Sequence, residues 1–596
     1  MLRLRPPLWL LAVACFALMA AALWLPFGLN ITDFSDTWVF YGSLDAGLPF
    51  LSDSRPFQLV MYHVAYAIDH NSFIGANILM LLFFIGKSLA VYGGLRLLLP
   101  QQPLFAFLSA ALLMLFPADT GTFWLAAFNV HSPVFFYFLA VFSLLWYWRS
   151  PHGLKLLLMG GSLVWSFTYE ANYPLIILTP LLLWVANGRL SRRVVRVTVL
   201  WYIVPVIMVA RLFLIAGQQG SGAFLYQEAL LQQGLGGGNI VARIADSFLR
   251  AYQRNIGTGW VETVLHLKSS LKTQHLLVAL VMTGLTMVVA WRHSQQSTIR
   301  LNVRQIAILL VAGLVIIGAG FASFIITNYR DINYRVFFLS ALGGALIAVT
   351  GISVISQLPE RAKRMVFIPA VLSPIIFNSR IAIVSAVAGG LGLLLLPGRM
   401  LLLILSSGLV LVGMLGMLRQ HDLYATMPLR QHWLQASIIQ QAPAVETNAV
   451  LVLLDETDDM RGALAFEARR DVFDSSLKYL YNSQAVTAVL CATASTRPDG
   501  LVGQCYFRDD GFEETWERGP HQFGYDQLIV FRYSDNEGAV LLDTLPDWMP
   551  SAASAQYHPR SLIVADAPLP DRVFTVFPSW PVQANPPIIT LGELRG

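Results

Sequence analysis

The sequence predicts a polytopic α-helical membrane protein with a smaller α/β domain at its C-terminal end. Of the 596 residues, 56% are hydrophobic and only 13% are charged, whereas soluble globular proteins carry about 25% charged residues. Apolar runs of about 20 residues recur along residues 1–420, as in proteins that cross a membrane repeatedly. The net charge of +5 reflects Arg residues placed in loops on one side of the membrane. It does not indicate a nucleic-acid partner.

About 13 apolar runs are candidates for membrane-spanning helices by hydropathy. They cover residues 8–29, 74–99, 104–117, 131–148, 155–169, 172–187, 194–216, 275–291, 305–326, 336–357, 365–378, 380–397 and 400–418. The first run has no small-residue cleavage site, so we expect a retained span rather than a signal peptide. The run at 57–68 is too short to cross comfortably and contains Tyr62, His63 and Tyr66. We therefore expect an interfacial helix that lies on the membrane.

The distribution of Lys and Arg predicts the topology. If 57–68 does not cross, basic residues gather in alternate loops, at Arg96, 149–155, 189–196, 292–304, 361–364 and Arg399. The opposite loops at 118–130 and near 170 have none. Because short cytoplasmic loops are rich in Lys and Arg, we expect a multi-pass protein of the cytoplasmic (plasma) membrane with a cytoplasmic N-terminus. The loops at 30–70 and 217–274 and the C-terminal domain are then extracytoplasmic.

Residues 421–596 are expected to form the α/β domain, which is large enough to bury its own core. The predicted strands cover 449–456, 485–492, 527–533, 539–543, 561–566 and 572–577, and a helix is predicted over 475–483. Cys491 and Cys505 lie on the oxidising side and could pair across neighbouring strands or remain unpaired.

The segment 30–70, between the first and second spans, concentrates acidic residues just outside the membrane. Its charged residues include Asp33, Asp36, Asp45, Asp53 and Arg55. A carboxylate such as Asp33 or Asp36 can act as general base toward an acceptor hydroxyl, and it can also hold a divalent cation. Alternatively, Asp36 caps the helix that begins there. Arg55 either pairs with one of these acids or orients the catalytic carboxylate.

Three further positions on the outer side carry charges that need an explanation. Glu170 follows the fifth span in a loop without a base, where a carboxylate is costly unless it has a function or is solvated at the headgroups. Arg330 and Arg335 lie in a short outer loop, and guanidinium groups match phosphate oxygens bidentately. Their alternative roles are contact with lipid headgroups or a pair with Asp331. Arg211, near the outer end of the seventh span, could join this basic cluster.

This arrangement resembles the class C (GT-C) membrane glycosyltransferases, including the protein O-mannosyltransferases and their bacterial relatives. Shared features are an external Asp-bearing loop after the first span, an interfacial helix led by Arg-Pro, an outer Glu, a late Arg pair and an extracytoplasmic C-terminal domain. More narrowly, Arg55-Pro56, Phe116-Pro117 and the SFTYE sequence at 166–170 are similar to motifs of the tetratricopeptide-containing transmembrane O-mannosyltransferases. The resemblance covers roughly residues 1–350. The family usually has adjacent acids in this loop, whereas Asp33 and Asp36 are separated here.

The resemblance implies a hexosyltransferase of the cell envelope that uses a polyprenyl-phosphate sugar donor and inverts the anomeric centre. The acceptor would be a glycan, a lipid or a protein. Asp36, directly before an aromatic helix, is the preferred base, and Asp33 is the second candidate. The implied donor-phosphate contacts are Arg330, Arg335 and Arg211, and the implied supporting residues are Arg55 and Glu170. A divalent cation is an optional cofactor.

Two other classes of function stay open at this point. A multi-span transporter or flippase for a lipid-linked saccharide would fit the hydropathy, although such proteins commonly show inverted repeats, and the sequence shows none. A non-catalytic membrane assembly protein could use the 421–596 domain as a binding module. It would have no use for an acid at Asp36.

Overall fold

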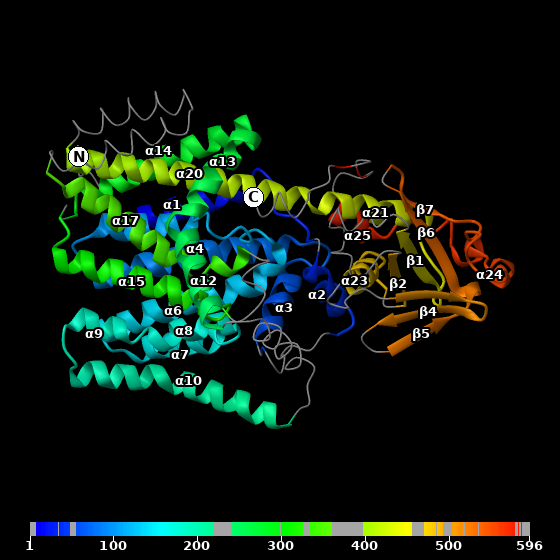
Figure 1. The fold of residues 1–596 in the computed structure, drawn as a ribbon, viewed down its shortest axis with the longest axis horizontal. Helices are drawn as coiled ribbons and strands as arrows, with labels where there is room; N and C mark the ends of the chain where they lie inside the picture. Colours follow the sequence, from blue (N-terminus) through cyan, green and yellow to red (C-terminus); the bar gives the residue numbers. More distant parts are fainter. Residues whose placement is uncertain are drawn as a thin grey trace.

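The chain forms an elongated molecule with a helical bundle in one part and a C-terminal α/β domain in the other (Figure 1). The computed structural model describes residues 7–33, 35–47, 55, 57–218, 240–297, 300–325, 334–359, 397–455, 470–483, 485–492, 504–516, 519–534, 536–577, 582 and 586. The end of the bundle next to the C-terminal domain is the one predicted to be extracytoplasmic. It is called the outer end below, and the opposite end is called the inner end.

Eleven of the predicted apolar runs coincide with helices, one of them broken in two. These helices are α1 (Leu8–Trp24), α4 (Ile74–Leu98), α5 (Pro103–Met114), α6 (Phe128–Arg149), α7 (Gly153–Ser166), α8 (Tyr173–Leu178) with α9 (Leu181–Asn187), α10 (Arg192–Gln218), α14 (Thr273–Ser294), α15 (Val303–Ala322), α17 (Ala341–Gln357) and α20 (Gly398–Thr426). Six helices among the described residues are long and apolar enough to cross a membrane. The predicted run at 365–378 lies outside the described residues, as does the run at 380–397 except for its last residue. The predicted polytopic helical fold is confirmed.

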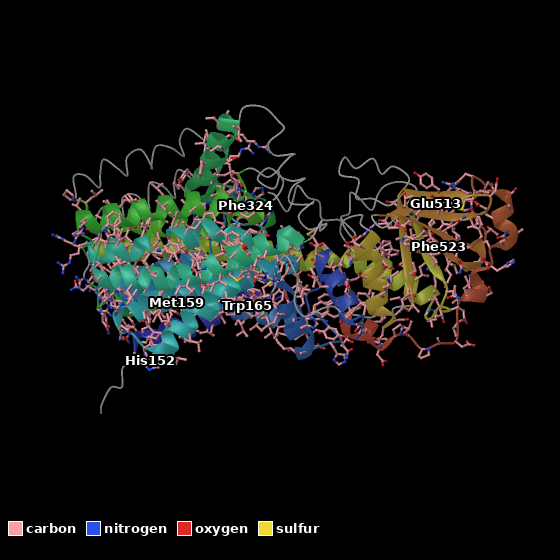
Figure 2. All side chains as sticks on the ribbon, turned by 90° about the horizontal axis from the view of Figure 1, so that it is seen from below. His152, Met159, Trp165, Phe324, Glu513 and Phe523 are labelled. Atoms are coloured by element: carbon pink, nitrogen blue, oxygen red, sulfur yellow. A yellow bond between two sulfur atoms is a disulfide. The ribbon has the colours of Figure 1, made fainter. Side chains whose placement is uncertain are left out.

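The run at 172–187 is the one that breaks. It forms α8 and α9 on either side of Thr179 and Pro180, because proline has no backbone N–H and its ring clashes with the preceding turn of a helix. The preceding helix, α7, is continuous. Figure 2 shows it passing from the region of His152, at the inner end, to Trp165, nearer the C-terminal domain.

Two short helices lie between the bundle and the C-terminal domain (Figure 1). They are α2 (Asp36–Leu44) and α3 (Gln58–Ile68). With 11 residues, α3 is about 16 Å long, or about half the thickness of a bilayer core. Its length agrees with the prediction that 57–68 does not cross. The long loop predicted at 217–274 contains α12 (Ile240–Gln253), a π-helical turn (Arg254–Thr258) and α13 (Gly259–Ser270).

The C-terminal domain contains a four-stranded sheet in the order β2-β1-β6-β7. Its strands are β1 (Val450–Asp455), β2 (Thr487–Ala492), β6 (Leu528–Ser534) and β7 (Gly538–Leu541). The central strand β1 is parallel to β2 and β6 and is buried along its whole length. Helices α21 (Pro428–Gln441) and α23 (Arg470–Leu480) pack on this sheet. Parallel strands are typically buried on both faces of the sheet. This burial explains why β1 is apolar at successive positions and not only at alternate ones.

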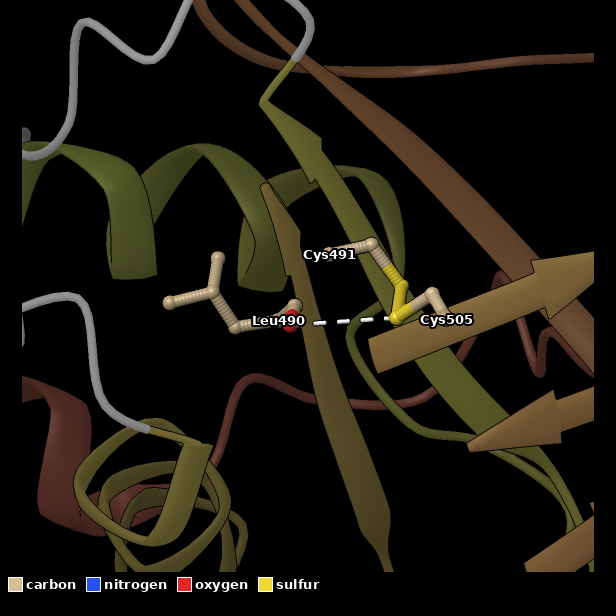
Figure 3. The surroundings of a disulfide bond; sticks show 3 residues. All are labelled: Leu490, Cys491 and Cys505. Atoms are coloured by element: carbon tan, nitrogen blue, oxygen red, sulfur yellow. Dashed lines mark hydrogen bonds between the residues drawn. A yellow bond between two sulfur atoms is a disulfide. The ribbon is translucent and has the colours of Figure 1, made fainter. Parts of the chain in front are cut away.

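A second, antiparallel sheet was not predicted from the sequence. It consists of β3 (Gln504–Arg508), β4 (Gly511–Trp516) and β5 (Gly519–Phe523). A disulfide between Cys491 of β2 and Cys505 of β3, with a Cα–Cα distance of 5.7 Å, joins the two sheets (Figure 3). The pairing of these two cysteines, left open by the sequence, is therefore settled.

Two predicted strands are wrong. Residues 561–566 fall on a short 3₁₀ helix (Pro559–Leu562) and a single bridge from Ile563 to Val445. Residues 572–577 form helix α25 (Asp571–Val576). Its buried residues are Arg572, Val573 and Val576, which share one face of a helix. Short apolar runs do not distinguish helix from strand by periodicity, and Asp571 favours a helical first turn.

Candidate functional site

Asp33 holds the first turn of α2, the helix that begins at Asp36. The side chain of Asp33 is only 1% exposed. One carboxylate oxygen accepts the backbone N–H of Thr37 at 2.9 Å and the hydroxyl of Ser35 at 3.3 Å. The other accepts the indole N–H of Trp124 at 3.0 Å. A carboxylate with several donors is stabilised in its ionised form, so Asp33 fixes the first turn of α2 against the loop that carries Trp124.

Asp36 has a different environment although it lies only three residues further on. It occupies the first turn of α2 and is half-buried. The helix N-cap is Ser35 rather than Asp36, so the alternative capping role considered for Asp36 is wrong. Burial raises the pKa of Tyr62 in α3 well above its ordinary value, and the charges of Asp36 and Asp33 add to this effect. Both carboxylates therefore lie near the Tyr62 side chain.

Arg55 and Glu170, 115 residues apart in the sequence, form a bidentate ion pair. The Nε and Nη2 atoms of Arg55 each lie 3.0 Å from a carboxylate oxygen of Glu170. The guanidinium group also lies 5.5 Å from the centre of the Tyr169 ring. Next to it, Phe57 stacks on Trp165 of α7 at 5.2 Å. Among the described residues, Arg55 thus pairs with Glu170 from a distant segment of the chain.

The C-terminal end of α2 is held by the C-terminal domain. Asp45, directly after α2, pairs with both terminal nitrogens of Arg572 in α25 and accepts the hydroxyl of Tyr66. Arg572 also donates to the carbonyl of Tyr479 at 3.0 Å, and its guanidinium lies 4.4 Å from the centre of the Tyr479 ring. The Asp45 and Arg572 side chains are 15% and 6% exposed. This pair is a buried connection between the two parts of the molecule.

The middle of α2 packs directly against α23. A Cβ atom placed on Gly42 would lie 2.5 Å from the carbonyl oxygen of Ser475, so only glycine allows this approach. Trp38 and Tyr41 pack edge-on against Tyr479, at 5.9 and 5.7 Å between ring centres. The helix with the candidate base is therefore held at its start by the bundle and along its length by the C-terminal domain.

The predicted phosphate-binding arginines are only partly placed. Arg211 lies in α10 with a half-buried side chain. Arg330 and the side chain of Arg335 lie outside the described residues. Of these three predicted phosphate contacts, the structure therefore describes the side chain of Arg211 alone.

A basic cavity that the sequence did not suggest lies between α13 and α20 near the outer end. The cavity is small, about 30 Å³, and its lining includes Arg254, Arg419, Glu262 and Thr120. Arg254 is 5% exposed, pairs with Glu262 and donates to the carbonyl of Ala118 at 3.0 Å. These contacts join residues that are far apart in the sequence, which is why no local motif indicated them.

One loop connects the basic cavity with α2. Thr120 lines the cavity, and Trp124, four residues later, donates to Asp33 and to Ser35 at 3.0 Å. Four residues of fully extended chain span at most about 14 Å. The cavity wall and the start of α2 are thus close enough to belong to one site. Within the part of the chain that the structure describes, no three His, Cys, Asp or Glu residues are grouped as metal ligands.

Comparisons with known proteins gave similarity to solved structures. No family model matches the chain, and no curated protein matches it significantly. Among solved structures, it is similar to the crystal structure of ArnT from Cupriavidus metallidurans bound to undecaprenyl phosphate. The match has 12% sequence identity and a TM-score of 0.39, and it covers 82% of this chain and 88% of that chain. At this identity and TM-score, the match by itself does not assign a family or an activity.

Proposed function

We propose that the chain is a GT-C-type membrane glycosyltransferase. It transfers a hexose from a polyprenyl-phosphate donor to a hydroxyl group of a glycan, lipid or protein acceptor on the outer side. The observation that carries this proposal is the placement of Asp36, a half-buried carboxylate in the first turn of a short helix that is held at both ends. This helix lies at the outer end of an apolar bundle, where a lipid-linked donor and a water-soluble acceptor can meet.

In the proposed reaction Asp36 acts as the general base. The acceptor oxygen attacks the anomeric carbon of the donor sugar while Asp36 accepts the hydroxyl proton. The bond between that carbon and the phosphate oxygen breaks, and polyprenyl phosphate leaves as an anion. One displacement with one base inverts the anomeric centre, as in inverting glycosidases. Asp33, whose oxygens already accept hydrogen bonds from Thr37 and Trp124, positions the turn that carries Asp36.

The leaving phosphate needs cationic partners at the outer end. Guanidinium groups suit this role because they match phosphate oxygens bidentately. The proposed partners are Arg211, Arg330 and Arg335 from the sequence resemblance, with Arg254 and Arg419 added because they line the basic cavity. The Arg55–Glu170 pair has a supporting role, since it holds the start of α3 against α7 and the following turn.

The experiment that tests this proposal measures release of polyprenyl phosphate by the purified full-length protein. The protein in liposomes is given a panel of undecaprenyl-phosphate hexoses with membrane-extract acceptors, and the products are identified by mass spectrometry. Asp36→Asn is expected to lower the rate by about 10²- to 10⁴-fold while the protein stays folded at the assay temperature. Asp69→Asn, a half-buried acid of the same segment, is the control and should keep the rate within threefold of the wild type.

Three results would contradict the proposal. The first is a rate for Asp36→Asn within threefold of the wild type. The second is movement of the intact donor across the membrane without any release of polyprenyl phosphate, which would favour a flippase. The third is no turnover of any donor and no co-purified polyprenyl phosphate, which would favour a non-catalytic assembly protein.

Treatment with EDTA and re-addition of Mg²⁺ or Mn²⁺ determines whether a divalent cation takes part.

A further inference from the structure

A large cavity lies between α9 and α15 at the inner end of the bundle. Its volume is about 420 Å³, within the roughly 300–1,000 Å³ of ordinary small-molecule pockets. Its walls come from α4, α6, α9, α15 and α17, and they are mainly aliphatic, with Leu95, Val185, Ile308 and Leu346 as examples. An amphiphile with an apolar body would fill this space without leaving polar groups unsatisfied.

The break at Pro180 explains why the cavity exists. On the outer side of the break, α15 packs closely on α8, whereas its packing on α9 is slight. A continuous helix would have followed α15 to the inner end, but proline interrupts the hydrogen-bond ladder and redirects the chain. The short helix α9 then ends at Gly188, which adopts φ +71°. The space between the two diverging helices is the cavity.

The mouth of the cavity is polar and lies at the inner end. Of the described residues that line it, Arg304 alone is charged. Its side chain is exposed, and one guanidinium nitrogen would lie 3.4 Å from a Cβ atom on Gly188. Arg304 therefore reaches from α15 across the mouth to the end of α9. Asn187, Asn302 and Gln305 complete the polar rim.

The depth of the cavity matches one leaflet of a bilayer. Along α15 its lining runs from Arg304 at the mouth to Ile316 at the deep end. These 12 residues of helix correspond to about 18 Å, and half of a bilayer core is about 15 Å. The deep end is lined by Ile316 and Leu342, so the polar rim lies at headgroup level and the apolar walls reach to mid-membrane.

We propose that this cavity is a binding site for an anionic glycerophospholipid of the inner leaflet, with its phosphate on Arg304 and its acyl chains between α9 and α15. The charge of the rim selects an anionic head, and the depth selects acyl chains of ordinary length. The site is separate from the proposed donor site, because the donor phosphate belongs to the outer end and the rim of this cavity lies at the inner end. Lipid binding here does not require that the proposed transfer activity be correct.

The test is native mass spectrometry on the delipidated full-length protein. Phosphatidylglycerol and phosphatidylcholine with identical acyl chains are titrated separately, and undecaprenyl phosphate is added as a competitor. Arg304→Gln is expected to weaken phosphatidylglycerol binding about fivefold, the effect of one basic residue at an anionic lipid surface, and to leave phosphatidylcholine binding unchanged. Ala312→Trp or Ala186→Trp, on opposite walls of the cavity, should lower binding of both lipids at least tenfold.

Arg292→Gln is the matched control, since Arg292 is an exposed arginine in the last turn of α14 that does not line the cavity. It should not change the binding of either lipid. Equal effects of Arg304→Gln and Arg292→Gln would overturn the proposal, as would unchanged binding in both tryptophan variants. Preferential occupancy by undecaprenyl phosphate, or by detergent alone, would also overturn it. Circular dichroism and melting temperatures of each variant confirm that the protein is folded.

Discussion

At the outer end of the bundle α2 is held by contacts at its start and along its length, whereas at the inner end α9 and α15 border a cavity of about 420 Å³. The outer contacts are specific: Asp33 binds Trp124 and Asp45 binds Arg572. At the inner end the walls are aliphatic, and among the described lining residues one side chain, that of Arg304, is charged. The two ends are therefore expected to respond differently to amino-acid substitutions.

The difference follows from what each end would have to bind. A base must be held within about 0.5 Å of its productive position, and a helix fixed at both ends meets that need. A lipid chain has no fixed shape, so a volume with apolar walls is sufficient. Substitutions at the outer end should act through broken pairs and steric clashes. Substitutions at the inner end should act through volume and through one charge.

Arg572→Ala is expected to have the largest effect on stability. Removal of one partner of a buried ion pair leaves the other charge buried without compensation and typically costs about 3–5 kcal/mol. The Asp45 and Arg572 side chains are 15% and 6% exposed. We expect a lower urea midpoint and faster hydrogen exchange throughout α2, measured by mass spectrometry in detergent.

The control for this variant is Arg560→Ala. Arg560 also forms a bidentate pair, with Asp543, but both side chains are more than 60% exposed. Exposed pairs contribute at most about 1 kcal/mol. If Arg560→Ala destabilised the protein as much as Arg572→Ala, the buried pair between α25 and α2 would contribute no more to stability than an exposed pair.

Asp33→Asn and Asp36→Asn should separate the two neighbouring acids. Asparagine at position 33 would turn an amide N–H₂ toward Thr37 or Trp124, which are both donors, at a cost of about 2 kcal/mol. Asp36 is half-buried in the first turn of α2, and Asn there should cost less, about 0.3–1 kcal/mol, because it removes a negative charge from the helix N-terminus. Thermal unfolding of both variants measures the difference. Equal destabilisation would contradict the structural role assigned to Asp33.

The parts of the fold that hydropathy and length determine were predicted from the sequence. The spans, the short helix at 58–68 and the central strands β1, β2 and β6 depend on local apolar pattern, which a sequence shows directly. The error at 572–577 has a physical cause. A run of six residues with four apolar side chains is too short to distinguish a strand from a short helix, and the pairing of Arg572 with Asp45, 527 residues away, is not visible locally.

The candidate site was predicted as a set of residues but not as a set of contacts. Arg55 and Glu170 were both selected because charges at the membrane surface need partners, yet nothing in the sequence shows that they pair with each other. The indole of Trp124, which distinguishes Asp33 from Asp36, also comes from a distant loop. The basic cavity at Arg254 and Arg419 was missed for the same reason.

Gly42→Ala tests how closely α2 approaches the C-terminal domain. The added methyl group would lie 2.5 Å from the carbonyl oxygen of Ser475. Overpacking costs about 1–3 kcal/mol, and the higher helix preference of alanine offsets up to about 1 kcal/mol. We expect a net loss of about 1–2 kcal/mol in urea unfolding. Gly351→Ala, at a helical glycine of α17 with open space around it, is the control and should be neutral or slightly stabilising.

The Arg55–Glu170 pair should show a smaller but measurable coupling. In a double-mutant cycle with Arg55→Ala and Glu170→Ala, we expect about 1 kcal/mol, because the pair is bidentate and each side chain is about one-third exposed. The more exposed pair Arg250–Asp246, on one helix, should give about 0.3–0.5 kcal/mol. A coupling of zero for Arg55 and Glu170 would remove the support that this pair gives to the start of α3.

Ala312→Leu should have the smallest effect and the opposite sign to Gly42→Ala. Ala312 faces the inner cavity, so a larger side chain fills empty volume and is expected to stabilise the delipidated protein by about 0.5 kcal/mol. Ala110→Leu in α5 adds the same atoms at a position that is 0% exposed and should cost about 1–3 kcal/mol. Differential scanning fluorimetry of both variants compares the two sites. A loss of stability in Ala312→Leu similar to that in Ala110→Leu would mean that the inner end is as tightly packed as the outer end.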